Sequence, residues 1–195
     1  MQTELIRLRE EAKKNGNPVL RDKSFELLTK TIIERQPKNI LEVGVNVGLS
    51  GIQMLLNCKH AKLTGIEIDE DCIKKAKENY ARFGVLDRVK IFTGDASEII
   101  PLLSGEYDFI FLDGPKGHYY EYLLNLLGVL KVGGIIFADN VLFRGYVDGS
   151  VKTPHRYMTT KNSMTKFLDR VTNSDDLQTT LYKIEDGVSI TQKIR

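Results

Sequence analysis

The fold is decided by residues 39–50, which read Asn-Ile-Leu-Glu-Val-Gly-Val-Asn-Val-Gly-Leu-Ser. A short apolar run ends at Gly44, and an apolar segment with helical spacing follows from about Leu49 to Cys58. The glycines between them permit a tight turn and the close approach of a ligand to the backbone. This stretch therefore predicts a buried strand, a turn open to a ligand and a helix.

Strands and helices alternate on both sides of this stretch. Amphipathic helices are expected over 2–14, 22–36, 69–84, 96–103 and 118–130. The short apolar runs between them lack strict alternation, which is typical of strands buried on both faces of a parallel sheet. These runs are 39–44, 62–69, 89–95, 107–114 and 133–140.

The C-terminal part departs from this alternation. After a polar stretch, we expect a helix over 161–171 and then two strands at 177–184 and 188–194, joined through the hairpin signal Asp186-Gly187. The whole pattern predicts an α/β fold with a doubly wound, mostly parallel, seven-stranded sheet and an antiparallel C-terminal hairpin. We expect one domain over 1–195, with N-terminal helices over 1–36 and a substrate-side loop over 141–160.

Composition narrows the class of protein. Of 195 residues, 42% are hydrophobic and 28% are charged, which is typical of a globular protein, and the net charge of +2 excludes a strongly basic nucleic-acid coat protein. We find no run of apolar residues long enough for a membrane span and no secretory signal, so we expect a cytoplasmic protein. Cys58 and Cys72 stand in no metal-binding or disulfide pattern.

The first three strands end in residues suited to an adenosine ligand. Glu67 lies 23 residues after Gly44, a spacing at which an acidic side chain accepts hydrogen bonds from ribose hydroxyls. Asp95 can accept from an adenine amino group and Ala96 can donate, although Asp95 could instead cap the following helix. The dinucleotide fingerprint fails because Asn46 and Leu49 stand where it needs glycines. We therefore favour a nucleoside without phosphates, of which S-adenosylmethionine is the common one, over a ligand-free turn.

Oxygen ligands end the fourth and fifth strands. Asp113 follows one strand, and Asp139 and Asn140 end the next, so neighbouring parallel strands would bring them together. Carboxylate and amide oxygens suit Mg²⁺ or a similar divalent cation, whereas each residue alone could simply cap a loop. Lys116 could lie beside the metal and act as a neutral base, the alternative being an exposed lysine. We expect Tyr119 or Tyr120 at the pocket wall and His118 in solvent.

At these residues the chain resembles the cation-dependent O-methyltransferases, the family of catechol and caffeoyl-coenzyme A methyltransferases. The resemblance lies in LEVGVNVGLS (41–50), GIEID (65–69), GDASEIIPLL (94–103), FLDGPKGHYY (111–120) and ADNVLFRG (138–145). It implies a class I methyltransferase fold, Mg²⁺ held by Asp113, Asp139 and Asn140, and Lys116 and Asp113 in catalysis. It also implies a homodimer. The expected cofactor-binding set is Leu20, Glu42, Gly44, Gly48, Ser50, Glu67, Ile68, Asp95, Ala96 and Asp113.

Other segments are similar to the bacterial tRNA 5-hydroxyuridine methyltransferases, which form 5-methoxyuridine at the wobble position. These segments are PVLRD (18–22), DNVLFRGYV (139–147) and EDGVSITQKI (185–194). The resemblance to the catechol enzymes implies a substrate-binding carboxylate two residues after Gly187, and Ser189 stands there instead. The implied partner is the anticodon loop of a tRNA.

The charge of residues 141–170 agrees with an RNA substrate. This segment carries a net charge of +4, and Arg144 and Arg156 could contact phosphates while Tyr146, His155 and Tyr157 stack on bases. A solvated helix face with a flexible loop is the plainer alternative. Three other functions stay open: a small-molecule catechol or caffeoyl-coenzyme A methyltransferase, a non-catalytic RNA- or nucleotide-binding module, and a nicotinamide-dependent dehydrogenase.

Overall fold

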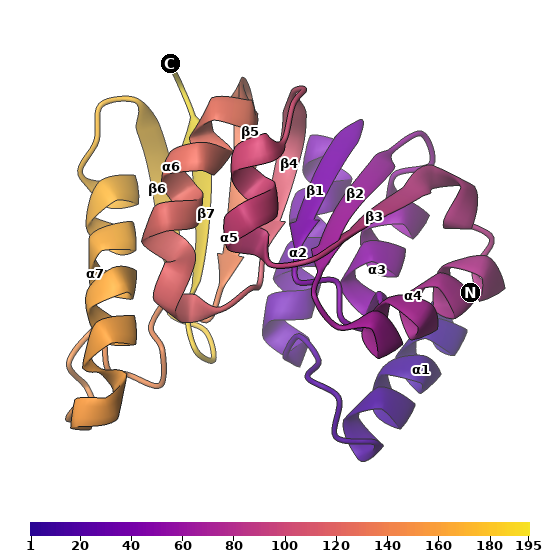
Figure 1. Ribbon diagram of the computed structural model, residues 1–195, viewed down its shortest axis with the longest axis horizontal. Helices are drawn as coiled ribbons and strands as arrows, with labels where there is room; N and C mark the ends of the chain where they lie inside the picture. The colour runs from indigo at the N-terminus through magenta and orange to yellow at the C-terminus, as the bar shows by residue number, and fades with distance from the viewer. The chain divides into compact units, whose positions relative to one another are not determined.

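The computed structural model describes residues 1–195 and divides into two compact units, Met1–Asp95 and Ala96–Arg195. Figure 1 labels the helices and strands of both units. The prediction of a single domain is not tested by this division. No helix is both long enough and apolar enough to cross a membrane.

The first unit is built on a parallel sheet. Its strand order is β3-β2-β1, and the register pairs Val43 with Ile66 and Glu67 with Thr93. The carboxyl ends of the three strands therefore share one edge, from which the turns after Val43, Glu67 and Thr93 emerge. The elements are α1 (Gln2–Lys14), α2 (Asp22–Arg35), β1 (Asn39–Val43), α3 (Leu49–Asn57), β2 (Lys62–Glu67), α4 (Glu70–Arg82), η1 (Leu86–Arg88) and β3 (Val89–Thr93).

Local signals explain where α4 begins and which face it buries. The Asp69 side chain accepts a hydrogen bond from the backbone N–H of Cys72 at 2.8 Å, which caps the first turn. Ile73, Ala76 and Tyr80 recur at helical spacing and are buried. The apolar face of α4 thus reaches the core of the first unit, and Tyr80 is fully buried there.

Gly65 in β2 offers a stability prediction. A Cβ at this position would lie 2.4 Å from Cγ2 of Val45, which is too close for a real contact. We expect Gly65→Ala to lower the free energy of unfolding by about 1–3 kcal/mol because the strand or Val45 must shift. The matched control is Gly128→Ala on α6 (Tyr119–Val129), where nothing lies within 4 Å of the added Cβ. There alanine should stabilise the helix by up to about 1 kcal/mol.

Urea denaturation of both variants measures these changes. Equal stability of Gly65→Ala and the wild type would contradict the close packing of β2 against Val45.

The second unit joins parallel and antiparallel pairing in one sheet. Its strand order is β4-β5-β7-β6, with β4 parallel to β5 and β7 antiparallel to both β5 and β6. Helices α6 and α7 lie side by side, as Figure 1 shows, and the ring of Tyr119 packs edge-on against that of Phe167. The elements are α5 (Ala96–Ile99), η2 (Ile100–Leu102), β4 (Tyr107–Leu112), η3 (Lys116–His118), α6 (Tyr119–Val129), β5 (Leu130–Asp139), η4 (His155–Tyr157), α7 (Met158–Thr172), β6 (Leu177–Tyr182) and β7 (Val188–Lys193).

The C-terminal hairpin forms where Asp186-Gly187 predicts it. Gly187 adopts a φ of +81°, which glycine tolerates, and a Cβ there would lie 2.4 Å from the Leu142 side chain. The hairpin places β7 next to β5, with Ser189 opposite Ala138 and Val188 opposite Asp139. The antiparallel addition to the sheet is therefore confirmed.

Two elements begin three residues before their predicted starts. Strand β5 begins at Leu130 rather than Gly133, because the pairing with β4 shifts register and Gly133, with a φ of +83°, lets the strand continue through the irregularity. Helix α7 begins at Met158 rather than Lys161, so the expected loop over 141–160 ends in the short helix η4 and the first residues of α7.

Candidate functional site

The turn after β1 holds the Glu67 carboxylate in place. Both Gly44 and Val45 donate their backbone N–H to the Ile66 carbonyl, at 3.0 and 3.3 Å, which fixes the turn against β2. The Asn46 N–H then donates to Glu67 Oε2 at 2.7 Å. The other carboxylate oxygen, Oε1, accepts hydrogen bonds from the backbone N–H groups of Ile68 and Asp69 at 2.9 and 3.0 Å.

These three donors orient Glu67 before any ligand arrives. The residue is half-buried, and Oε2, which accepts only one of the three hydrogen bonds, has a second lone pair to offer. The group can therefore accept from a ribose hydroxyl, as the spacing predicts. Ile68, with 64% of its surface exposed, presents an apolar side chain beside it that an adenine ring could cover.

Glu42 and Ser50 form a second polar group beneath the same turn. Glu42 is fully buried, its Oε1 accepts a hydrogen bond from the Ser50 hydroxyl, and its Oε2 lies 3.5 Å from the Tyr80 hydroxyl. Burial, followed by the nearby Glu42 charge, raises the pKa of Tyr80 well above its ordinary value, so Tyr80 stays a neutral donor. Glu42 and Ser50 were both predicted to bind the cofactor. Only Ser50, which is half-buried, is accessible to a ligand.

Gly48 fits the expected tight turn closely. Its φ is +83°, and a Cβ there would lie 3.0 Å from the Tyr80 ring. Leu20, also predicted at the cofactor, is 8% exposed and lies in the segment between α1 and α2. Asp95 is exposed and immediately precedes Ala96, the first residue of α5.

The predicted metal ligands share one strand edge in the second unit. The register pairs Leu112 with Ala138, so Asp113 and Asp139 follow at equivalent positions of the neighbouring strands β4 and β5. At that register their Cα atoms should lie about 5 Å apart. Asn140 comes next in a left-handed conformation with a φ of +58°, which asparagine tolerates better than most residues.

The chemistry of this donor set fits a hard divalent cation. Asp139 is 3% exposed, and Asp113 and Asn140 are half-buried, so three residues with oxygen-bearing side chains stand at the ends of neighbouring strands where water is partly excluded. No group of three or more His, Cys, Asp or Glu side chains is placed to hold a metal. The predicted set has two carboxylates and needs the Asn140 amide as its third ligand.

Lys116 lies within this group, as predicted, but its charge state differs from the neutral amine expected. The Nζ of Lys116 donates to Asp113 Oδ1 at 2.6 Å. Burial tends to lower the pKa of Lys116, but Tyr119 and the Asp113 carboxylate raise it by more, and the net direction is upward. Lys116 is therefore an ammonium at neutral pH while it pairs with Asp113.

Tyr119 is buried rather than at a pocket wall, so of the expected pair only Tyr120, which is partly exposed, could line a pocket. Tyr119 is fully buried, and its hydroxyl lies 2.9 Å from the Leu112 carbonyl and 3.1 Å from the Asp139 carbonyl. Burial raises its pKa, so the phenol stays protonated and donates. Tyr119 thus joins the ends of β4 and β5 directly below the predicted metal ligands.

His118 is half exposed and pairs with Glu121 at 3.1 Å, which agrees with its expected place in solvent.

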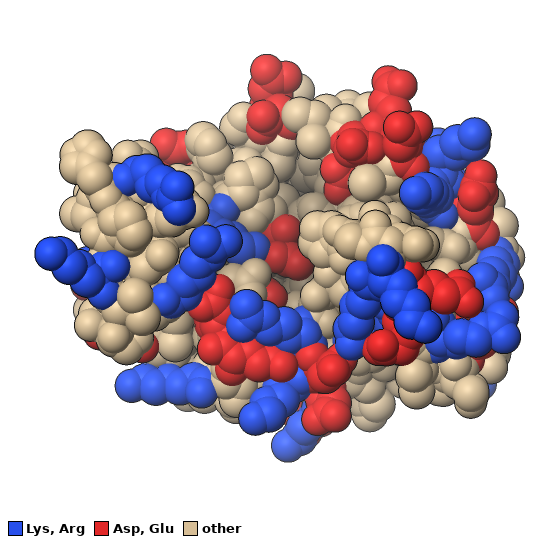
Figure 2. All heavy atoms as spheres, turned by 90° about the horizontal axis from the view of Figure 1, so that it is seen from below, with Lys and Arg blue, Asp and Glu red and all other residues tan.

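The predicted RNA-contacting arginines gather around one aromatic ring. The guanidinium carbons of Arg144 and Arg156 lie 5.5 and 4.7 Å from the centre of the Tyr157 ring. Tyr146, expected to stack on a base, is 8% exposed and instead stacks on Tyr157 with ring centres 5.6 Å apart, because Phe143 also packs against it. Figure 2 shows Lys and Arg side chains in blue among tan residues on the left of the view.

Sequence reasoning missed Arg9, Asn46 and Tyr157 as organising residues. Asn46 served only to exclude the dinucleotide fingerprint, although its N–H binds Glu67. Arg9 lies in a charged helix and is nonetheless 4% exposed. A cation at a position that the helical pattern places on the buried face is the signal that could have found it.

Comparison with known proteins gives one family. A family model described as O-methyltransferase matches residues 4–194. Among curated proteins, the catechol O-methyltransferase of Niastella koreensis is 38% identical over 117 residues, covering 57% of this chain and 53% of that protein. The catechol O-methyltransferase of Sus scrofa is 30% identical over 171 residues, covering 83% of this chain and 91% of that protein.

Solved structures agree with the family match. The SAH-bound Podospora anserina methyltransferase PaMTH1 superposes with a TM-score of 0.85 at 26% identity, covering 97% of this chain and 87% of that chain. The predicted fold class, a mostly parallel seven-stranded α/β sheet with antiparallel C-terminal strands, is confirmed. The matched segments span little more than half of two curated relatives, 53% of the Niastella koreensis protein and 56% of the Stellaria longipes caffeoyl-CoA O-methyltransferase.

Proposed function

Because the chain belongs to the O-methyltransferase family, we propose that it transfers the methyl group of S-adenosylmethionine to a hydroxyl oxygen. The observation that carries the proposal is the alignment of Asp113 and Asp139 on neighbouring strands, with Lys116 2.6 Å from Asp113. An amine that can take a proton once the neighbouring carboxylate charge is neutralised, beside two carboxylates that can hold a cation, suits the activation of a hydroxyl.

The first unit supplies the groups for the cofactor. Glu67 would accept from the ribose hydroxyls, and Ser50, fixed by Glu42, would meet the amino-acid end. The SAH-bound structure of PaMTH1 supports a cofactor of this class. A dinucleotide is disfavoured because Asn46 and Leu49 replace the glycines that a pyrophosphate needs.

The second unit supplies the groups for the acceptor. Asp113, Asp139 and Asn140 would hold Mg²⁺ or a similar cation, which lowers the pKa of a hydroxyl bound near it. Neutralising the Asp113 charge would also remove one of the effects that keep Lys116 protonated. Lys116 would then take the proton from the hydroxyl, and the oxygen would attack the methyl carbon in line with the departing sulfur. The products are the methyl ether and S-adenosylhomocysteine.

For the acceptor we propose 5-hydroxyuridine at the tRNA wobble position. Three features support this choice: the resemblance of segments 18–22, 139–147 and 185–194, the net charge of +4 over 141–170, and Ser189 in place of a catechol-binding carboxylate. Ser189 is fully buried opposite Ala138 and has no charge with which to grip a diol. Arg144 and Arg156 around Tyr157 offer both phosphate contacts and a stacking face.

One assay tests the reaction and the acceptor together. The protein is mixed with S-adenosylmethionine, Mg²⁺ and tRNA bearing 5-hydroxyuridine, and the nucleosides are analysed by mass spectrometry. We expect a metal-dependent gain of one methyl group on 5-hydroxyuridine. Methylation of caffeate-like phenols and none of tRNA would favour a small-molecule methyltransferase, to which the catechol relatives point. No methyl transfer to either would favour a non-catalytic binding module.

The basic cluster allows a separate prediction on tRNA binding. We expect Arg144→Gln and Arg156→Gln each to weaken binding and to reduce the slope of log K against log salt by about one. The control is Lys30→Gln, an exposed lysine on α2 outside the cluster, which should leave both quantities unchanged. Filter binding between low and moderate salt measures them. An unchanged slope in both arginine variants would place the RNA elsewhere.

A further inference from the structure

The segment between α1 and α2, residues 17–21, is held from two sides although it forms no helix or strand. We call this segment the strap. From one side, Nη2 of Arg9 donates to the Leu20 carbonyl at 2.9 Å. From the other, Nδ2 of Asn46 donates to the Pro18 carbonyl at 3.0 Å. The strap therefore links α1 to the turn after β1.

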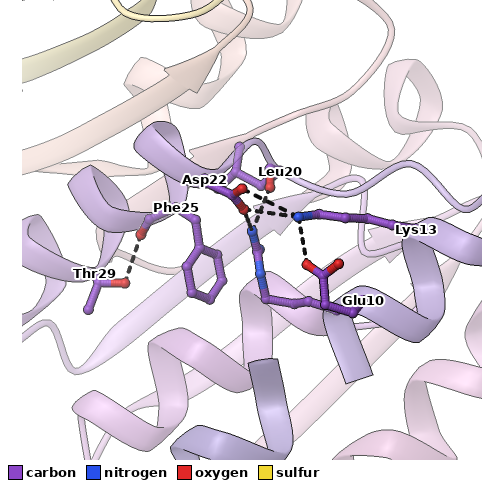
Figure 3. Close-up of polar contacts among 7 residues, drawn as sticks. Glu10, Lys13, Leu20, Asp22, Phe25 and Thr29 are labelled. Atoms are coloured by element: carbon purple, nitrogen blue, oxygen red, sulfur yellow. Dashed lines mark hydrogen bonds and ion pairs between the residues drawn. The ribbon is translucent and has the colours of Figure 1, made fainter. Parts of the chain in front are cut away.

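Arg9 reaches the strap through the interior of the first unit. Its side chain is 5% exposed, its Nη2 also bonds Asp22 Oδ1 at 2.8 Å, and its guanidinium carbon lies 3.6 Å from the centre of the Phe25 ring. In Figure 3 the polar contacts converge on the Asp22 carboxylate, and the Leu20 carbonyl lies beside it. The remaining Nη1 is buried and makes no hydrogen bond.

If Arg9 served only to stabilise the fold, its burial would cost more free energy than the burial of an apolar residue. A buried guanidinium with one nitrogen unsatisfied gives up hydration that an apolar residue would not need. Lys13 already ties α1 to Asp22, with Nζ 3.1 Å from Oδ1, from a more exposed position. The hydrogen bond that Arg9 makes and Lys13 does not is the one to the Leu20 carbonyl.

Asn46 carries the connection onward to the proposed ribose ligand. It has a φ of +49°, a left-handed conformation that costs energy in a residue other than glycine. In that conformation its side chain binds the strap while its own N–H binds Glu67 Oε2 at 2.7 Å. Displacement of the strap would therefore act on the residue that orients the carboxylate.

We propose that Arg9 is a positioning residue for the cofactor, acting through the Leu20 carbonyl, the strap and Asn46 on Glu67. The inference rests on the proposed cofactor and not on the nature of the acceptor. It assigns to α1 a role in the affinity for S-adenosylmethionine, although Arg9 itself touches no ligand.

The test is calorimetric titration of the whole protein with S-adenosylhomocysteine. We expect Arg9→Met, which keeps most of the side-chain volume over Phe25, to raise the Kd about tenfold. The KM for S-adenosylmethionine should rise in parallel, and kcat at saturating cofactor should stay near the wild-type value. Arg9→Lys, which can restore one bond to the Leu20 carbonyl, should recover part of the affinity.

The matched control is Lys13→Met, which removes a contact of α1 with Asp22 and leaves the strap bonds intact. It should bind S-adenosylhomocysteine as the wild type does. Asn46→Gly keeps the left-handed turn and removes the strap bond from its other side, so it should raise the Kd even where Arg9→Met fails to fold.

Two results would overturn the inference, and they are distinguishable. If folded Arg9→Met and Asn46→Gly bind S-adenosylhomocysteine as tightly as the wild type, the strap does not position the cofactor site. If the wild type itself binds none, the proposed cofactor is wrong and the inference fails with it.

Discussion

Asp139→Ala is expected to abolish methyl transfer, with kcat falling by about 10³-fold or more. The loss follows because Asp139, 3% exposed at the end of β5, is one of only two carboxylates in the proposed metal site. The affinity for S-adenosylhomocysteine should stay unchanged, since the cofactor groups of the first unit remain. Single-turnover kinetics and calorimetry measure the two quantities.

Two controls separate chemistry from folding. Asp139→Asn preserves the shape of the side chain and should show a similar loss, with a partial return of activity at high Mg²⁺. Asp108→Asn removes a carboxylate from β4 that pairs with Lys131 at 2.7 Å, and it should retain wild-type activity. Undiminished turnover of Asp139→Ala in the presence of a chelator would show that the metal assignment is wrong.

Lys116→Met should lower kcat by about 10²- to 10⁴-fold, the contribution of a positioned general base. The wild-type rate should rise with pH, because Lys116 accepts a proton only when it is neutral. The variant should lose this rise. The pH profile of single-turnover methyl transfer is the measurement.

Lys131→Met is the matched control for the loss of a paired lysine in the same unit. It should keep both the rate and its pH dependence. If Lys116→Met lowers the rate and keeps the wild-type pH profile, Lys116 positions Asp113 and another group takes the proton.

The strand ends could be predicted because each follows an unmistakable apolar run. Glu67 ends β2, Asp113 follows β4 and Asp139 ends β5, and parallel pairing brings such positions to one edge of the strands within each unit. That step needs only the alternation of strands and helices, which the sequence shows clearly. The hairpin was predicted from the turn signal Asp186-Gly187 between two short strands.

Side-chain partners could not be predicted in this way. Tyr119 and Tyr120 are neighbours in sequence, and nothing local indicates that Tyr119 turns into the core between β4 and β5. The burial of Tyr146 depends on Phe143 and Tyr157, which the irregular segment after β5 brings together. The charge state of Lys116 likewise follows from a 2.6 Å contact that spacing allows but does not require.

The two thiols of the first unit differ in their accessibility to reagents, so the turn that binds Glu67 can be labelled selectively. Cys58 is 2% exposed, and burial raises its pKa to about 11, so alkylating reagents should pass it by. Cys72 is partly exposed, and its sulfur lies 3.7 Å from Asn46 Oδ1 on the turn that binds Glu67. A fluorophore attached to Cys72 would therefore report on that turn from a single native site, without engineered cysteines.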